Sequence, residues 1–338
     1  MPTRRTLARR TVVRHPSGLT LQTPLLVPSF SSKGFGSDSG ANSEVHEIFR
    51  AASEVLTETM LVSAYDIYYE HLPQLDAAIT ELTFVDSGGY EIDPYHDLST
   101  VFRQGVSASD WDREKLGDVL HGWPQHVPAV FISFDHPESR MPLDDQIESS
   151  KSFFVEFPGH LHEILIKPEK KSHQYVQVKN VVASASLFGG FDVIGVTEKE
   201  LGGHLLERMK VIAEMRLAFD DAGVNSPIHV FGSLDPVTSV LYFLAGAEIF
   251  DGLTWLRFGY IDGQAVYIQN FGALKVGIGR RQDRIKANAI AENCLYLTNL
   301  QNQMSTFTVD QNFSRFKHHS KFLKESYDLL RTKVGRLS

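Results

Sequence analysis

Short runs of β-branched and aromatic residues recur along the middle of this chain, and amphipathic stretches separate several of them. The runs are Thr83–Val85, Ala129–Phe134, Ile164–Ile166, Val193–Val196, Ile228–Phe231 and Glu248–Phe250. The clearest amphipathic stretch is Glu198–Ala222, where apolar residues recur at steps of three and four, as on one face of a helix. Asp235-Pro236 is typical of a helix start and predicts a second helix that ends near Ala245-Gly246. Strands that alternate with helices predict a parallel sheet covered by helices.

The motifs and the length of the chain indicate whether such a sheet is open or closed. The chain has neither a three-glycine dinucleotide fingerprint after a strand nor a phosphate-binding loop with a lysine, so nothing supports an open nucleotide-binding sheet. Its 338 residues are enough for a closed barrel of roughly 250 residues with additions. We therefore predict an α/β fold, a (β/α)8 TIM barrel with a basic helical subdomain at its C-terminal end.

The charge of the chain is unevenly distributed. The net charge is −8, but residues 275–338 contain 12 Lys and Arg against 5 Asp and Glu, a net of +7, which leaves −15 on residues 1–274. We place the domain boundary there, with a barrel over 1–274 that includes N-terminal strands, and a basic segment over 275–338. Such a segment suits contact with a polyanion, and a solvated helical surface with a chance excess of charge is the alternative. Its densest group of cations is Arg280, Arg281, Arg284 and Lys286.

Cysteine content and hydropathy exclude several classes of protein. Cys294 is the only cysteine, so neither an intramolecular disulfide nor an all-cysteine zinc site can form. No run approaches the ~18 apolar residues that a membrane span needs. Five arginines lie within Met1–Arg14, but no apolar run follows them as it would in a secretory signal. We expect a cytoplasmic protein with no membrane partner.

Aspartates follow three of the expected strands. They are Asp86, Asp135 and Asp251. In a (β/α)8 barrel, the carboxyl ends of the strands converge on the active-site face, so these side chains would surround one pocket. A single strand-end Asp is more often a helix cap or turn former, but three together favour a site. Two carboxylates on opposite sides of a pocket suit glycosidic-bond chemistry, in which one attacks the anomeric carbon and the other moves a proton. Three further polar residues near strand ends are expected to support loops or the site, not to act as catalysts: His136, Glu138 and His229.

Seven segments match, in order and over nearly the whole chain, the motifs of one enzyme family. They are Thr23–Pro28 (T-P-x-x-x-P), Ser63–Ile67 (loosely N-T-Y-H-L), Val85–Glu91 (D-S-G-G-F-Q), Phe134–Pro137 (F-D-E), Phe191–Gly195 (the stretch before I-G-G-L), Phe231–Asp251 (G-x-x-x-P-x-D…G-x-D-x-F-D) and Phe250–Arg257 (F-D-C-V-x-P-T-R). Each piece alone is weak, but D-S-G-G with a later F-D is fairly specific. In these motifs the chain resembles the tRNA-guanine transglycosylases, which are (β/α)8 barrels that exchange a guanine base in a polynucleotide for a 7-deazaguanine.

The resemblance implies a role for each matching residue. Asp251 would be the nucleophile on ribose C1′, and Asp86 would be the general acid and base. Asp135 would bind the pyrimidine edge of the guanine-like base in a charge-assisted, bidentate contact. The base pocket would include Ser87, Gly88, Gly89, Glu91 and Gly195. The residues implied to contact the nucleic acid are Arg257, Arg280, Arg281, Arg284 and Lys286.

The chain also departs from the family motifs. Glu91 stands where the family has Gln, Ile194–Thr197 has lost one glycine of I-G-G-L, and Leu165–Pro168 replaces the family's V-Q-G-G. The zinc motif C-x-C-x-x-C reads Glu292–Leu297 here, which leaves Cys294 alone. His319 or its neighbour His318 could stand for the distant His, but one thiolate and one imidazole do not make a tetrahedral site. We therefore expect no cofactor; zinc with Glu292 as a third ligand is the disfavoured alternative, because Leu297 cannot be the fourth.

Three functions remain open from the sequence. The first is an active transglycosylase-like enzyme acting on tRNA or DNA, with guanine or a 7-deazaguanine as the exchanged base. The second is a non-catalytic accessory or nucleic-acid-binding subunit of a transglycosylase complex. The third is a barrel glycosidase or nucleoside hydrolase that uses the same carboxylates with water as acceptor. The resemblance further implies a homodimer, although the altered zinc region belongs to the family's dimer contact.

Overall fold

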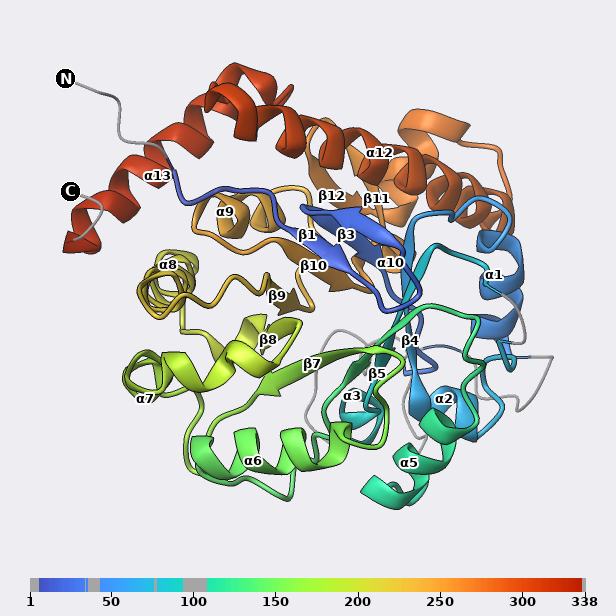
Figure 1. The fold of residues 1–338 in the computed structure, drawn as a ribbon. Helices are drawn as coiled ribbons and strands as arrows, with labels where there is room; N and C mark the ends of the chain where they lie inside the picture. The colour runs from blue at the N-terminus through green and yellow to red at the C-terminus, as the bar shows by residue number, and fades with distance from the viewer. Residues whose placement is uncertain (1–5, 34, 36–42, 76–77, 94–107, 336–338) are drawn as a thin grey trace.

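The computed structural model describes residues 6–33, 35, 43–75, 78–93 and 108–335, and its centre is a sheet of eight parallel strands. The strands are β3 (Leu25–Pro28), β4 (Thr59–Ser63), β5 (Leu82–Asp86), β6 (Ala129–Ile132), β7 (Leu161–Ile166), β8 (Val193–Thr197), β9 (Ile228–Phe231) and β10 (Ile249–Gly252). Their order in the sheet is β3-β10-β9-β8-β7-β6-β5-β4. A parallel bridge between Ser29 and Leu61, and a hydrogen bond of 2.9 Å from the Phe30 N–H to the Leu61 carbonyl, join the two edges. The sheet therefore closes into a (β/α)8 barrel, as predicted (Figure 1).

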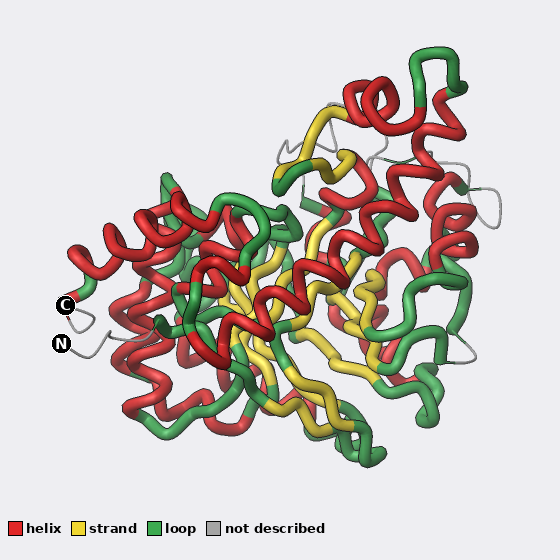
Figure 2. The backbone as a smooth tube through the Cα atoms, turned by 90° about the horizontal axis from the view of Figure 1, so that it is seen from above, coloured by secondary structure: helices red, strands yellow, loops and turns green. Residues whose placement is uncertain are grey.

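Helices surround the barrel (Figure 2). They are α1 (Glu44–Ala52), α2 (Ala64–Tyr68), α3 (Gly89–Ile92), α5 (Arg113–His121), α6 (Leu143–Phe154), α7 (Val178–Ala183), α8 (Leu205–Asp221), α9 (Thr238–Leu244), α10 (Thr254–Arg257), α11 (Ile268–Phe271), α12 (Gln282–Asp310) and α13 (Ser320–Lys333). Two antiparallel pairs are added, β1 (Val12–Arg14) with β2 (Thr20–Gln22) and β11 (Phe258–Ile261) with β12 (Gln264–Tyr267). Within the described part of the chain, no helix combines the length and the apolar character that crossing a membrane requires.

The two expected helices differ in how well their starts were predicted. The helix expected from Glu198 begins only at Leu205, after a short 3₁₀ turn over Glu198–Glu200. The prediction was wrong there because the pair at 202–203 is Gly-Gly, which breaks the helix despite the apolar spacing on either side. The second helix is present, but α9 begins only at Thr238, and Val237, not Asp235, is in the cap position. Asp235 Oδ1 accepts hydrogen bonds from the N–H groups of Val237 (2.8 Å) and Thr238 (3.1 Å) in the turn that leads into this helix.

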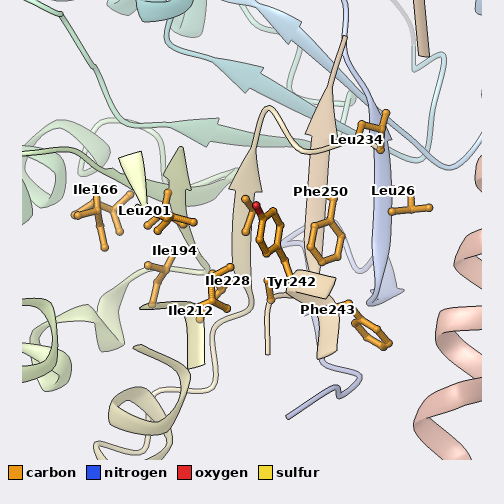
Figure 3. Close-up of a cluster of buried hydrophobic side chains, with 14 of the residues drawn as sticks. Leu26, Ile166, Ile194, Leu201, Ile212, Ile228, Leu234, Tyr242, Phe243 and Phe250 are labelled. Carbon is orange, nitrogen blue, oxygen red and sulfur yellow. The ribbon is translucent and has the colours of Figure 1, made fainter. Parts of the chain in front are cut away.

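Alternation along the strands divides their side chains between two cores. The outward faces pack against the helices in one large cluster, part of which is drawn in Figure 3, where Ile194, Ile228 and Phe250 lie near Tyr242 of α9. The inward faces form a second apolar cluster inside the barrel: Leu25, Val27, Leu61, Leu82, Phe84, Val130, Ile132, Leu161, Leu165, Val193, Phe231 and Ile249. Because side chains two apart share a face, the same alternation turns four ionisable residues of these strands inward: Asp86, Glu163, His229 and Asp251.

The basic C-terminal segment packs directly on the barrel. Leu300, Met304 and Phe307 of α12 belong to the same apolar cluster as the outward strand faces. The side-chain oxygen of Gln301 also accepts a hydrogen bond from the N–H of Leu26 in β3 (3.0 Å). Residues 275–335 therefore supply part of the helical layer that covers the barrel, and the expected boundary at 274/275 falls inside a π-helical turn over Gly272–Val276.

Replacing Phe307 with alanine tests whether α12 shares the barrel core. Phe307 is fully buried, and its ring packs against Phe243 of α9, at 6.3 Å between centroids. We expect Phe307→Ala to lower the free energy of unfolding by about 3–5 kcal/mol in urea titrations followed by circular dichroism. The matched control is Val309→Ala, two residues along the same helix and 73% exposed, which should change it by under about 0.5 kcal/mol. Equal, small effects would mean that α12 is not part of the cooperative core.

Candidate active site

A cavity of about 310 Å³ lies at the carboxyl ends of the barrel strands. Its lining comes from all eight strands of the barrel or from the segments that follow them. Asp86, Asp135 and Asp251 all line it, so the prediction that these three strand-end aspartates surround one pocket is confirmed. This is the end of the barrel at which active sites of this fold are built.

Asp251 is held on both of its carboxylate oxygens. The Ser29 hydroxyl donates to Oδ2 (2.7 Å), and the Gly232 N–H donates to Oδ1 (3.1 Å). The Nε2 atom of His229 lies 3.3 Å from Oδ1. Ser29 follows β3 and Gly232 follows β9, the two neighbours of β10 in the sheet, so the pairing of the strands themselves fixes the orientation of this carboxylate.

Asp86 has a different environment. It ends β5, and the polar contact made by its side chain is a hydrogen bond of 3.1 Å from the Gly88 N–H to Oδ2. Gly88 adopts a φ of 87°, which lets the chain turn back on the carboxylate at little cost. Burial, together with the charges of Glu91, Asp251 and Asp135, raises the pKa of Asp86 to about 8, although the Gly88 hydrogen bond opposes the rise. Asp86 can therefore carry a proton near neutral pH.

Two further carboxylates are buried beside Asp86. Glu91 of α3 lines the cavity and accepts hydrogen bonds from the hydroxyls of Ser31 and Ser63. Asp66 of α2 is fully buried and accepts from the N–H (2.7 Å) and the hydroxyl of Ser32. Burial raises the pKa of both carboxyl groups, and repulsion between the neighbouring charges adds to it for Asp66. Sequence reasoning gave Asp66 no role; its position just after β4, like that of Asp86 on β5, is the signal that could have found it.

Asp135 lies in a network of four alternating charges. Arg140 Nη1 is 2.7 Å from Oδ1 of Asp135, and Lys167 Nζ is 3.2 Å from Oδ2. Glu200 forms ion pairs with the same cations, at 2.9 Å from Lys167 and 3.6 Å from Arg140 Nη2. Both Asp135 oxygens are thus engaged by cations, and a ligand that uses this carboxylate must compete with them. The sequence reasoning missed this network, although Lys167 lies in the segment that departs from the family's V-Q-G-G motif.

The structure divides the small residues that the resemblance assigns to the base pocket. Ser87 and Gly89 line the cavity, and a Cβ on Gly89 would come within 2.8 Å of the Asp135 carbonyl. Gly88 and Gly195 are not among the residues that line this cavity, and their contact with a base stays a prediction. The α-carbon of Gly88 faces the Trp111 indole, and Gly195 lies deeper in the barrel, where a Cβ would be 2.6 Å from a Glu163 oxygen.

The basic residues predicted to contact nucleic acid lie in two places. Arg257 of α10 lines the cavity, and its Nη2 atom is 3.3 Å from both the Lys33 carbonyl and the Tyr90 hydroxyl. The other four are exposed at or just before the start of α12: Arg280, Arg281, Arg284 and Lys286. Two of these four pair with carboxylates, Arg281 with Asp283 (3.0 Å) and Lys286 with Glu44 (2.9 Å).

The residues that correspond to the zinc motif are placed as follows. Cys294 is buried in α12, and burial raises the pKa of its thiol to about 11, which disfavours the thiolate that binds metals. His319 is exposed and immediately precedes α13. Among the residues that the structure describes, no group of three or more His, Cys, Asp or Glu side chains is arranged to hold a metal ion.

Comparison of the chain with known protein families and with curated proteins finds no match to either.

Proposed function

We propose that this protein is a glycosyltransferase of the tRNA-guanine transglycosylase type, which exchanges a guanine base in tRNA or DNA for a 7-deazaguanine. The observation that carries the proposal is that one cavity holds two aspartates in contrasting environments. Asp251 receives hydrogen bonds that suit a carboxylate, whereas burial and like charges favour a proton on Asp86. A double displacement at a sugar carbon needs one carboxyl group of each kind.

The geometry supports a reaction in two halves. In the first, a carboxylate oxygen of Asp251 attacks ribose C1′, the bond from C1′ to the guanine ring nitrogen breaks, and Asp86 gives its proton to that nitrogen. In the second, the Asp86 carboxylate takes the ring N–H proton of the incoming base. The nitrogen then attacks C1′, and the bond to Asp251 breaks. The same two residues serve both halves, and Asp86 regains its proton at the end.

The surroundings of the cavity suit a nucleic-acid substrate. Arg257 lines the cavity and carries guanidinium N–H groups near a phosphate-ribose backbone that would enter there. The exposed cations at 280–286 supply a second, outer contact for phosphates. Tyr90, Phe231 and Phe258 line the same cavity and offer aromatic surfaces to a base.

One observation favours the alternative of a non-catalytic subunit. Arg140 and Lys167 already occupy both oxygens of Asp135, the carboxylate that the resemblance assigns to base recognition. In an active enzyme, the donors of the base would have to displace at least one of these cations. The placement of both Asp86 and Asp251 in one cavity argues for catalysis, and we therefore keep the enzyme as the proposal.

Base exchange in the presence of labelled guanine tests the proposal. The protein is incubated with radiolabelled guanine and either tRNA or DNA, and the products are separated on a denaturing gel. We expect label in one of the two polymers and a covalent protein–polymer adduct. Loss of guanine with neither label nor adduct would indicate a hydrolase instead. If neither polymer changes, although the protein binds one of them, the accessory-subunit alternative replaces the enzyme.

A further inference from the structure

Behind Asp251, on the side away from the cavity, lies a second ionisable group. His229 of β9 is fully buried and bridges two carboxylates. Its Nδ1 is 2.8 Å from Glu163 Oε1, and its Nε2 is 3.3 Å from Asp251 Oδ1. Glu163 is also fully buried, and neither Glu163 nor His229 lines the cavity. Of the three, only Asp251 reaches the space where a substrate would bind.

This arrangement is costly in the interior of a barrel. Most side chains on the inward face are apolar, and the His229 ring contacts the rings of Phe231 (3.9 Å between centroids) and Phe84 (5.5 Å). A buried ion pair is often less stable than apolar side chains of the same volume. Stability therefore gives little reason for a Glu–His pair here, and its contact with Asp251 points to a role in the site.

The two nitrogens of His229 each face a carboxylate. Nδ1 is hydrogen-bonded to Glu163, whereas Nε2 lies at ion-pair distance from Asp251 without hydrogen-bond geometry. Only the imidazolium carries a proton on both nitrogens, and it places a positive charge between the two carboxylates. Burial alone would lower the pKa of His229, but the charge of Glu163 and the contacts with both carboxylates outweigh it and raise the pKa to about 9. Among the described residues packed around the ring, the ionisable ones are Glu163 and Asp251.

Gly195 makes the arrangement possible. It pairs with Leu165 of β7 and with His229 of β9, and a Cβ at this position would be 2.6 Å from both Glu163 Oε1 and the Phe231 ring. Any side chain would push the Glu163 carboxylate away from His229. The glycine that the sequence assigned to the base pocket therefore leaves room for the Glu163–His229 pair.

We propose that His229, held by Glu163, is a positively charged positioning residue that orients the Asp251 carboxylate for attack on the sugar carbon. The role of Asp251 as nucleophile rests on the proposed function, whereas the charge and contacts of His229 do not. The proposal is therefore tested at two levels, one of which needs no catalytic activity.

The first test is the protonation state of His229 in the full-length protein. Two-bond ¹H–¹⁵N spectra of the imidazole rings, assigned with His229→Gln, are recorded from pH 6 to 10. We expect both ring nitrogens of His229 to be protonated at pH 7.5. Glu163→Gln should make the ring lose its proton at a lower pH. A neutral ring at pH 7.5 in the wild-type protein would overturn the proposal, whatever the enzyme's activity.

The second test measures the rate of covalent adduct formation in single-turnover experiments. We expect Glu163→Gln and His229→Phe to slow it by about 100-fold, the usual cost of removing one preorganised donor, with unchanged affinity for the polynucleotide. His229→Gln, which can still offer an N–H to Asp251, should be faster than His229→Phe. Should His229→Phe not fold, Glu163→Gln and His229→Gln carry the test alone.

The two proposals fail in different ways. If the wild-type protein forms no adduct with any polymer, the proposed function fails, and the spectra still decide the state of His229. If the wild-type protein forms the adduct and the folded Glu163→Gln variant forms it equally fast, the positioning role is wrong and the proposed function stands.

Discussion

Asp251→Asn will reduce base exchange by about 10⁴-fold or more and will abolish the covalent adduct on a denaturing gel. The amide keeps the size of the side chain and can still contact Ser29 and Gly232, but it has no anionic oxygen to attack C1′. The loss should appear in the rate of the first half-reaction, measured in a single turnover, with little change in polynucleotide affinity. The matched control is Asp145→Asn, an exposed position on α6 that removes the same charge and should leave the rate unchanged.

An adduct that persists in Asp251→Asn would show that another residue is the nucleophile. Asp86 is then the next carboxylate to test, because it lines the same cavity. A rate loss accompanied by an equal loss of folded protein would instead indicate a structural role, so thermal unfolding of the variant is measured in parallel.

Asp86→Asn will lower the exchange rate by about 10²–10⁴-fold, the range typical of losing a general acid–base residue. In the wild-type protein the first half-reaction needs the protonated carboxyl, and the pKa of Asp86 is about 8. The rate should therefore be maintained below pH 8 and decline above it, and the residual rate of the Asn variant should lack this decline.

Glu91→Gln tests whether Asp86 is the group whose titration causes the alkaline decline in rate. The charge of Glu91 is one cause of the raised pKa of Asp86, after burial. Removing it should move the alkaline decline of the first half-reaction to lower pH while leaving a measurable rate. A decline at the same pH in both proteins would mean that Asp86 is not the group that titrates.

The raised pKa of Asp86 also has a consequence for stability. Between about pH 4 and pH 8, the folded protein keeps a proton on Asp86 that the unfolded chain has already lost. The free energy of unfolding contributed by this group therefore falls as the pH rises through that window. Asp86→Asn should remove this contribution, so the variant should gain stability relative to the wild-type protein most clearly at or above pH 8.

The barrel could be predicted from the sequence because its signal is local and repeated. Six of the eight strands stand out as β-branched or aromatic runs, and helices separate them at the spacing that parallel pairing requires. Strand β3 was identified only through its resemblance to a family motif, and only the last residue of β4, Ser63, falls in such a motif. The late start of α8 was missed because apolar spacing continues across Gly202-Gly203, where the backbone cannot stay helical.

Of the candidate site, only the residues at the ends of the strands could be predicted from the sequence. Asp86, Asp135 and Asp251 follow strands directly, so the convergence of strand ends was enough to bring them together. The pairing of Glu163 with His229 joins residues 66 apart in the chain, and it depends on the closed barrel and on the space left at Gly195. Arg140 and Lys167, which pair with Asp135, likewise come from separate loops, and no local sequence pattern predicts these pairs.

The first and last strands of the barrel, β3 and β10, pair at the proposed nucleophile. Strand β3, near the start of the chain, pairs in register with β10, so that Asp251 lies opposite Val27 and next to the hydroxyl of Ser29. During synthesis, β3 emerges more than 200 residues before β10, and its place beside β10 stays empty until then. A partly synthesised chain therefore cannot hold the Asp251 carboxylate in this orientation. The site becomes complete only when β3, the first strand of the barrel, has paired with β10, the last.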